Sequence, residues 1–263
     1  MRLDLYLVHH QYFESRNKAA ASVKEGSFTV NGRVILKPSY EIGEKDVVAA
    51  LRNETVYVAR SAHKLLRAFQ VFSLDWCGKT AADFGASTGG FCQVLLEKGV
   101  RKIYAVDIGT AQLHSSLKSN DRIVNMEHTN ARYLAAESFS ENIEIITADL
   151  SFISLKMVLP AVYQTLTENG EAVLLVKPQF EAGPAHLSKT GVVADRKIHC
   201  KVLEEISILS KNIGFSVAGI AFSGLPGESG NREYLLYLKK SNENSVSIPS
   251  AAKAAVYWEE KNE

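Results

Sequence analysis

The sequence predicts an α/β protein in which a Rossmann-like, doubly wound sheet is preceded by a small α+β domain. Three observations lead to this fold class. From about residue 80 onward, short apolar runs alternate with helical stretches, which is typical of a parallel sheet with right-handed crossovers. Before residue 48, apolar residues at helical spacing are followed by two β-rich runs around a turn, which is typical of a hairpin. Near the end of the chain two strand-like runs lie close together, so we expect a final antiparallel hairpin.

We expect the small domain to occupy residues 1–58. The apolar spacing in residues 2–13 predicts a first helix, and Ser15 is a suitable N-cap for a second helix that stops at Gly26. Two β-rich runs then flank Asn31-Gly32, a pair that tolerates the positive φ angles of a type I′ turn. A hairpin should follow the helix pair, with a further short strand in residues 43–51.

The second domain should span residues 59–240 and the remaining residues, 241–263, should form a C-terminal tail. The candidate strands are residues 80–85, 102–109, 143–152 and 171–178. A long helix is expected at residues 196–212, and the final pair of strands at 216–224 and 232–240. The tail begins polar, and a short helix is expected to start near Ser250. A parallel sheet of this kind places ligands at the carboxyl ends of its strands.

Composition excludes several classes of protein. The 263 residues carry 30 basic and 29 acidic side chains, so net charge neither demands nor excludes a nucleic-acid partner. Three widely spaced cysteines form no C-x-x-C pair, and the seven histidines show no metal spacing, so we expect no metal site and place the histidines at the surface. With no signal peptide or membrane-length apolar run, a cytoplasmic location without a membrane span is expected.

The stretch "DFGASTGGF", Asp83 to Phe91, fits three patterns. It contains the G-x-S-x-G elbow of a serine hydrolase, it nearly matches a dinucleotide fingerprint, and it suits a glycine loop for S-adenosylmethionine. A dinucleotide fold needs glycine where this chain has Ser87. An elbow normally follows several earlier strands and an oxyanion loop, which are missing upstream. A methyltransferase is therefore favoured, and a hydrolase using Ser87 stays as the alternative.

An acidic residue about 20 positions after the loop strengthens the methyltransferase hypothesis. Asp107, in "YAVDIG", stands at the tip of the next strand, where a carboxylate can accept hydrogen bonds from both ribose hydroxyls of the cofactor. S-adenosylmethionine carries no phosphate, so its loop needs only small residues. The predicted cofactor-binding residues are Asp83, Gly85, Ala86, Ser87, Gly89, Gly90, Phe91, Asp107 and Ile108.

The residues after the later strands indicate which atom accepts the methyl group. The run 149–152 reads "DLSF" instead of the Asp/Asn-Pro-Pro-aromatic motif of amine methylation, and no Pro-Cys nucleophile occurs, which leaves an oxygen acceptor. Asp149 and Lys177 end two parallel strands, and Glu233 begins an antiparallel one, so all three should meet at one edge of the sheet. Lys64 is the candidate second cation that would favour a neutral, basic lysine.

These motifs together resemble the TlyA, or hemolysin-A-like, family of ribosomal RNA ribose methyltransferases. The matching stretches are "RLDLYLV", "ESRNKAAASVKEGSFTVNG", "DFGASTGGF", "YAVDIG", "DLSFISL", "LVKPQFEAG", "GVVADRKIHCKV" and "GNREYLLYL". The resemblance implies a class I methyltransferase domain of the FtsJ type that uses S-adenosylmethionine, joined to an RNA-binding domain of the ribosomal-protein S-four type. It implies ribosomal RNA or a ribosomal subunit as partner.

The resemblance also implies roles for particular residues. Lys64, Asp149, Lys177 and Glu233 would form the tetrad of ribose methylation, with Lys177 as proton acceptor, the two acids orienting the lysines and Lys64 steadying the alkoxide. The residues implied for RNA binding are Arg2, Arg16, Lys18, Lys24 and Arg33.

The chain departs from the family at two places. It has Ala59-Arg60-Ser61-Ala62 where Ser-Arg-Gly-Gly is common, and the stretch 51–60 lacks the tryptophan of the family's linker. The family name refers to haemolysis, so a further alternative is an RNA-binding or haemolysin-like protein whose methyltransferase domain is inert.

Overall fold

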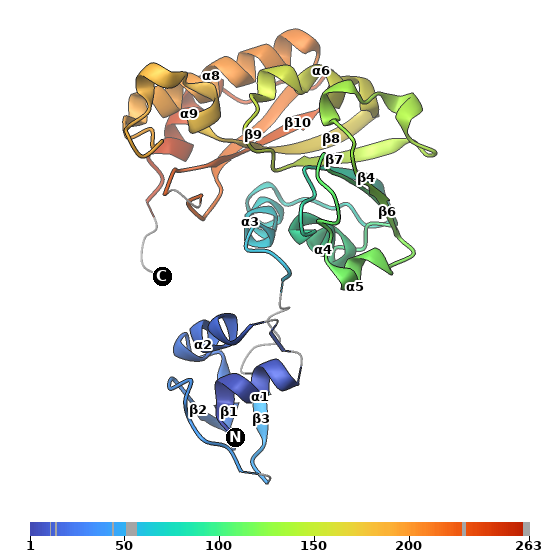
Figure 1. Ribbon diagram of the computed structural model, residues 1–263. Helices are drawn as coiled ribbons and strands as arrows, with labels where there is room; N and C mark the ends of the chain where they lie inside the picture. The colour runs from blue at the N-terminus through green and yellow to red at the C-terminus, as the bar shows by residue number, and fades with distance from the viewer. Residues whose placement is uncertain (11, 14, 44, 51–56, 228–229, 260–263) are drawn as a thin grey trace. The chain divides into compact units, whose positions relative to one another are not determined.

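A computed structural model describes residues 1–259 except 11, 14, 44, 51–56 and 228–229. The chain divides into two compact units, Met1–Tyr57 and Val58–Glu263 (Figure 1). The α/β fold class is confirmed. Residues 51–56, which belong to the stretch without the family's tryptophan, lie outside the described residues.

The first unit contains the helix pair and the hairpin that its capping and turn residues predict. Its elements are α1 (Leu3–His9), α2 (Arg16–Lys24), β1 (Phe28–Val30), β2 (Arg33–Val34) and β3 (Val48–Ala50). The three strands are antiparallel in the order β2-β1-β3. Asn31 and Gly32 have φ angles of 52° and 78°, as a type I′ turn requires. The Ser15 hydroxyl caps α2 by accepting a hydrogen bond from the Lys18 amide.

The second unit is built on a seven-stranded sheet with the order β6-β5-β4-β7-β8-β10-β9. The strands are β4 (Thr80–Phe84), β5 (Lys102–Val106), β6 (Ile123–Met126), β7 (Ile143–Ala148), β8 (Leu166–Val176), β9 (Ser216–Phe222) and β10 (Tyr234–Lys239). The first five of these are parallel, and β10 runs antiparallel to both β8 and β9, so the predicted final hairpin is present. We did not predict β6, because this edge strand is short and only partly buried.

Helices cover both faces of this sheet (Figure 1). The helices are α3 (Ala62–Phe72), α4 (Gly90–Glu97), α5 (Ser115–Lys118), α6 (Leu159–Thr165), α7 (Pro178–Glu181), α8 (Arg196–Ile213) and α9 (Ile248–Val256). Single 3₁₀ turns are η1 (Ala131–Tyr133), η2 (Ala136–Ser138), η3 (Leu155–Met157) and η4 (Pro184–His186). Helices α3 and α4 lie on one face, and α6, α8 and α9 lie on the other.

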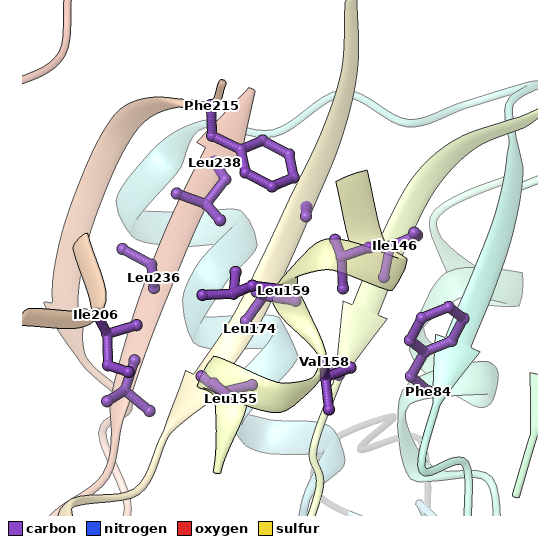
Figure 2. Packing of buried hydrophobic residues seen from close by; sticks show 14 of the residues in the cluster. Phe84, Ile146, Leu155, Val158, Leu159, Leu174, Ile206, Phe215, Leu236 and Leu238 are labelled. Atoms are coloured by element: carbon purple, nitrogen blue, oxygen red, sulfur yellow. The ribbon is translucent and has the colours of Figure 1, made fainter. Parts of the chain in front are cut away.

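The largest buried cluster lies between the sheet and the α6, α8 and α9 layer. Figure 2 shows Leu159 of α6 and Ile206 of α8 packed toward Leu174 and Leu236 on neighbouring strands. All four side chains are fully buried. Burial of each such side chain contributes about 1.5–3 kcal/mol, so this layer holds β8 and β10 firmly together.

The short helix that we expected near Ser250 is present, but it packs into the core instead of belonging to a separate tail at residues 241–263. Helix α9 begins at Ile248, and its buried residues Ile248, Ala252, Ala255 and Val256 belong to the main core cluster. Their spacing is that of one helical face, and this spacing is the sequence signal that we overlooked. The segment is part of the second unit.

The chain order of the strands reverses direction beside β4. The connections from β4 lead outward through β5 to β6, and the chain then returns to place β7 on the opposite side of β4. Ligand crevices form at the carboxyl ends of the strands at such a switch point. The predicted site residues at the ends of β4, β5, β7 and β8 surround this point.

Candidate active site

Four charged side chains from four segments meet at the carboxyl edge. The Lys64 ammonium donates to Glu233 Oε2 at 2.6 Å and to Asp149 Oδ2 at 3.3 Å. The Lys177 Nζ lies 2.7 Å from the other Asp149 oxygen. The four side chains therefore form one connected cluster in which Asp149 bridges the two lysines. This is the convergence that the strand-end positions predicted.

The cluster is removed from solvent and balanced in charge. Lys64, Lys177 and Glu233 are 8%, 7% and 3% exposed. Burial opposes a charge on Lys64, but the carboxylates of Asp149 and Glu233 outweigh it and raise the pKa of Lys64. The raised pKa favours the charged form of Lys64, and its role as the second cation stays a prediction.

Ser151 is an additional residue that sequence reasoning missed. Its hydroxyl oxygen accepts a hydrogen bond from Lys177 Nζ at 3.0 Å. Asp149 Oδ1, by contrast, is buried and close to Lys177 without receiving a well-directed hydrogen bond. One N–H of Lys177 is therefore directed at Ser151, while Asp149 contributes charge. Ser151 stands two residues after Asp149 in "DLSF", and this is the signal that could have identified it.

The departure at residues 59–62 is accommodated by the glycine loop. Ser61 precedes the first turn of α3, which carries Lys64. A Cβ atom added to Gly90 would lie 2.5 Å from the Ser61 hydroxyl and 3.0 Å from Ala59 Cβ. The start of α3 therefore packs directly on the start of α4, and this contact locates Lys64 relative to the loop.

The glycine loop follows β4 and needs its glycines. Gly85 has φ of +82°, and a Cβ there would lie 3.0 Å from the Asp149 carbonyl oxygen. Gly89 has φ of +97°, and a Cβ would collide with Leu117. A side chain at either position is excluded both by backbone conformation and by space. Ala86 and Phe91 are buried and support the turn from below.

The residues predicted to hold S-adenosylmethionine fit a nucleoside ligand. The Asp107 carboxylate accepts the Ser87 amide at 2.8 Å and the Gly109 amide at 2.7 Å, so the loop fixes it while each oxygen keeps a free lone pair. Ile108 beside it is 69% exposed and offers an apolar surface. The lone pairs of Asp107 can accept hydrogen bonds from ribose hydroxyl groups, and the adjacent Ile108 can contact the base attached to that ribose.

Asp83 lies beneath the loop. Its carboxyl group is 1% exposed and accepts hydrogen bonds from Thr147 at 2.8 Å and from the Cys92 thiol at 3.3 Å. Burial, reinforced by the charges of Asp149 and Asp107, raises the pKa of Asp83 to about 7 despite these two hydrogen bonds. The position suits support of the turn, and direct contact with the cofactor stays a prediction.

An exposed aromatic side chain borders the charged cluster. Phe152 is 93% exposed and has φ of +60°, a strained value for a residue other than glycine. Its ring centroid lies 5.4 Å from that of Phe180, over which Lys177 Nζ lies at 5.8 Å. Sequence reasoning did not select Phe152, although it occupies the place of the aromatic residue in amine methyltransferases.

Two of the predicted RNA-binding residues take part in a structural ion pair. Arg2 and Arg16 both donate to the buried carboxylate of Asp4 at 2.9 Å. Burial opposes ionisation of Asp4, but the two guanidinium groups outweigh it and lower its pKa. Lys18, Lys24 and Arg33 lie on the exposed surface of the same unit. Their contact with RNA stays a prediction.

One prediction about the histidines was wrong. His199 is 2% exposed, because it lies on the same face of α8 as Val202, Leu203 and Ile206. Its ring nitrogens are paired with the Tyr234 hydroxyl and the Val193 carbonyl. Among the residues that the structure describes, no cluster of metal-ligating side chains occurs and no helix could cross a membrane.

The fold and the site define a Rossmann-like methyltransferase, in which a glycine loop and a Lys-Asp-Lys-Glu cluster share the carboxyl edge of the sheet. The family model of FtsJ-like methyltransferases matches residues 57–240, and that of the S4 domain matches residues 1–48. The chain belongs to the FtsJ-like methyltransferase family. This membership favours methyl transfer over the hydrolase alternative for Ser87.

Relatives match along nearly the whole chain. The 16S/23S rRNA (cytidine-2′-O)-methyltransferase TlyA of Mycobacterium tuberculosis is 36% identical over 94% of this chain and 92% of its own. The 23S rRNA (cytidine-2′-O)-methyltransferase TlyA of Campylobacter jejuni is 33% identical over 92% of this chain and 100% of its own. A solved Streptococcus thermophilus structure, described as a hemolysin, is 37% identical with a TM-score of 0.74, covering 97% and 94% of the two chains. The resemblance drawn from the motifs is confirmed.

Proposed function

We propose that this enzyme transfers a methyl group from S-adenosylmethionine to the 2′-hydroxyl of a ribose in ribosomal RNA. The observation that carries the proposal is the Lys64–Asp149–Lys177 cluster with Glu233, buried beside the glycine loop. The FtsJ-like family and the rRNA cytidine-2′-O-methyltransferases among the relatives support the same reaction. We propose a cytoplasmic location with ribosomal subunits or their RNA as partner.

The cofactor would lie across the loop after β4. Asp107 would accept hydrogen bonds from its ribose hydroxyls, and Ile108 would contact its base. When bound, S-adenosylmethionine supplies an electrophilic methyl group on a sulfonium. The positive φ angles of Gly85 and Gly89 fix the shape of the turn that would receive it.

The cluster would move the proton of the acceptor hydroxyl. Lys177 accepts this proton at Nζ in its neutral form, with Ser151 fixing the direction of the amine. Lys64 stays charged and lowers the energy of the negative charge that develops on the ribose oxygen. Asp149 and Glu233 hold the two lysines at fixed places, so the charge does not have to reorganise during the reaction.

Two surfaces would hold the RNA. The exposed Phe152 ring offers a stacking face for a nucleobase next to Lys177, since base stacking on an aromatic side chain contributes about 1–3 kcal/mol. In the first unit Arg2, Arg16, Lys18, Lys24 and Arg33 would contact phosphates. Such contacts are sequence-blind and weaken with salt.

The test is methyl transfer from radiolabelled S-adenosylmethionine to ribosomal subunits and to naked ribosomal RNA, followed by alkaline hydrolysis. Ribose methylation protects the adjacent phosphodiester, so the label should appear in alkali-resistant dinucleotides. Lys177→Ala should lower transfer by at least about 100-fold, because it removes the proton acceptor. Wild-type transfer by this variant would refute the assigned role of Lys177, and label in alkali-sensitive mononucleotides would refute ribose as acceptor.

Cofactor binding is measured separately by calorimetry. Asp107→Ala should weaken binding of S-adenosylmethionine by about tenfold or more, since it removes a charged acceptor of two hydroxyl groups. Phe152→Ala should leave this binding unchanged and lower the affinity for RNA. A chain that binds RNA but no S-adenosylmethionine would instead be an RNA-binding protein with an inert methyltransferase domain.

A further inference from the structure

Glu233 lies one residue outside the paired part of β10. The strand begins at Tyr234, which pairs with Val176 of β8 and with Phe222 of β9. The Glu233 carboxylate must nevertheless stay within 2.6 Å of Lys64. The Glu233 carbonyl accepts the Ser223 amide at 3.0 Å, and the rest of its placement depends on what holds the nearby residues Asn231 and Tyr234.

Asn231 is anchored to the segment that precedes α8. It is 2% exposed, its Oδ1 accepts the Val193 amide at 3.0 Å, and its Nδ2 donates to the Gly191 carbonyl at 3.0 Å. Its own carbonyl accepts the Gly227 amide at 2.8 Å. A Cβ atom on Gly227 would collide with Glu233 Oε1, so this turn packs against the carboxylate itself.

Tyr234 is anchored to the same segment through His199. The Nε2 of His199 lies 2.7 Å from the Val193 carbonyl, and Nδ1 lies 2.6 Å from the Tyr234 hydroxyl. A carbonyl can only accept, so Nε2 carries a proton, and the neutral ring accepts the Tyr234 hydroxyl at Nδ1. The Nε2 of His199 and the Asn231 amide thus both contact residues 191–193, while Nδ1 of His199 links this segment to Tyr234.

From these contacts we propose that Asn231, Tyr234 and His199 form a positioning cluster, which holds Glu233 against Lys64 without touching the substrate. The inference rests on the proposed function of the Lys64–Glu233 pair. The cluster lies on the β10 side of the sheet, away from Gly85 and Asp107. Its loss should therefore slow methyl transfer and leave the affinity for S-adenosylmethionine unchanged.

The electrostatic surroundings suit a neutral His199. Burial, together with the nearby cations Arg232 and Arg196, lowers the pKa of His199, although the Val193 carbonyl and Asp195 oppose this. The Tyr234 hydroxyl, with its pKa raised to about 12 by burial, stays a donor. A protonated ring would offer two donors and could no longer accept from Tyr234.

The same strand supplies a matched control. Tyr237 donates its hydroxyl to Glu171 at 2.8 Å, at the opposite end of β10. Tyr234→Phe and Tyr237→Phe each remove one hydroxyl and one hydrogen bond from β10. Tyr234→Phe should lower the single-turnover rate about tenfold with an unchanged dissociation constant for S-adenosylmethionine. Tyr237→Phe should keep the rate within about twofold of wild type.

A second pair of variants tests the anchor from its other side. His199→Ala should slow transfer as Tyr234→Phe does, and His199→Gln should recover part of the rate, because its amide can still donate to the Val193 carbonyl. Equal rates for Tyr234→Phe and Tyr237→Phe, or a loss that follows cofactor affinity, would overturn the inference. Wild-type enzyme that methylates no RNA would refute the proposed function instead.

A stability measurement decides the inference without any activity. In a double-mutant cycle, unfolding free energies are compared for Tyr234→Phe, Glu233→Gln and the two together. If Tyr234 positions Glu233, the two losses are non-additive, whereas the cycle of Tyr237→Phe with Glu233→Gln is additive. Additive losses in the first cycle would contradict the positioning role whatever the substrate is.

Discussion

The two edges of the large sheet both bury carboxylates but treat them differently. At the amino edge, Glu171 accepts neutral donors from Trp76 and Tyr237, both at 2.8 Å, and the Lys79 ammonium adds a contact at 3.3 Å. At the carboxyl edge, Glu233 and Asp149 face ammonium groups. A carboxylate surrounded by neutral donors is satisfied and inert, whereas one that faces mainly ammonium groups keeps charge available for chemistry.

The comparison is tested most strongly by the same substitution at both edges. Glu233→Gln should lower methyl transfer about 1,000-fold, because it unbalances the charge around Lys64 while keeping the side chain's shape. Glu171→Gln should leave transfer within about twofold of wild type and destabilise the fold by about 1–3 kcal/mol, since an amide cannot accept from all three donors. Single-turnover transfer and urea unfolding measure the two effects. Equal losses of activity would remove the distinction between the edges.

Asp83 sharpens the comparison, because it lies at the carboxyl edge but has neutral partners. Its pKa of about 7 in the folded state exceeds the ordinary value, so the folded state binds the extra proton, and the contribution of Asp83 to stability should fall as pH rises from about 4 to 7. Asp83→Asn should abolish this decline and stabilise the protein at pH 8 by a few kcal/mol. Urea unfolding across this range is the measurement. Identical pH profiles of stability for the wild type and Asp83→Asn would contradict the assignment.

His199 should give the opposite pH dependence. Its pKa is lowered on folding, so its contribution to stability is complete above pH 6.5 and is lost as pH falls below that value. The urea midpoint of the wild type should therefore fall between pH 6.5 and pH 5 by more than that of His199→Gln. Identical acid profiles for the two proteins would show that the ring titrates as it does in the unfolded chain.

The smallest effect is expected at the amino edge. Lys79 contacts Glu171 from a partly exposed position, with 31% of its side chain accessible. Lys79→Met should change the free energy of unfolding by less than about 1 kcal/mol and leave methyl transfer unchanged. Thermal unfolding and the transfer assay test this. A large loss would mean that Glu171 depends on its cation after all, as Glu233 does.

Much of the fold followed from local signals. Alternating strands and helices gave the parallel sheet, and Asn31-Gly32 gave the hairpin, because turn chemistry and burial act over short distances. Two parts did not follow. The edge strand β6 lacks a continuous apolar run, and the apolar face of α9 was hidden behind a polar start to residues 241–263.

The site was predicted unevenly for a related reason. Asp149, Lys177 and Glu233 could be brought together because strand direction alone sends them to one edge. Lys64 was selected as a candidate second cation, but only the family resemblance placed it in the tetrad, since nothing in a helix sequence tells which edge its first turn meets. Ser151 and Asn231 could not be selected, because no periodic pattern in the sequence marks either position. His199 did leave one, because it occupies an apolar position on the face of α8.

The contact between Gly90 and Ser61 has an evolutionary consequence. The start of α4 meets the start of α3 so closely that a Cβ atom at residue 90 would collide with the Ser61 hydroxyl. A family member with a larger residue at one of these positions must carry a smaller residue at the other. Positions 61 and 90 should therefore covary across distant sequences, so that the size of the residue at position 61 limits the size of the residue at position 90 in the glycine-rich turn.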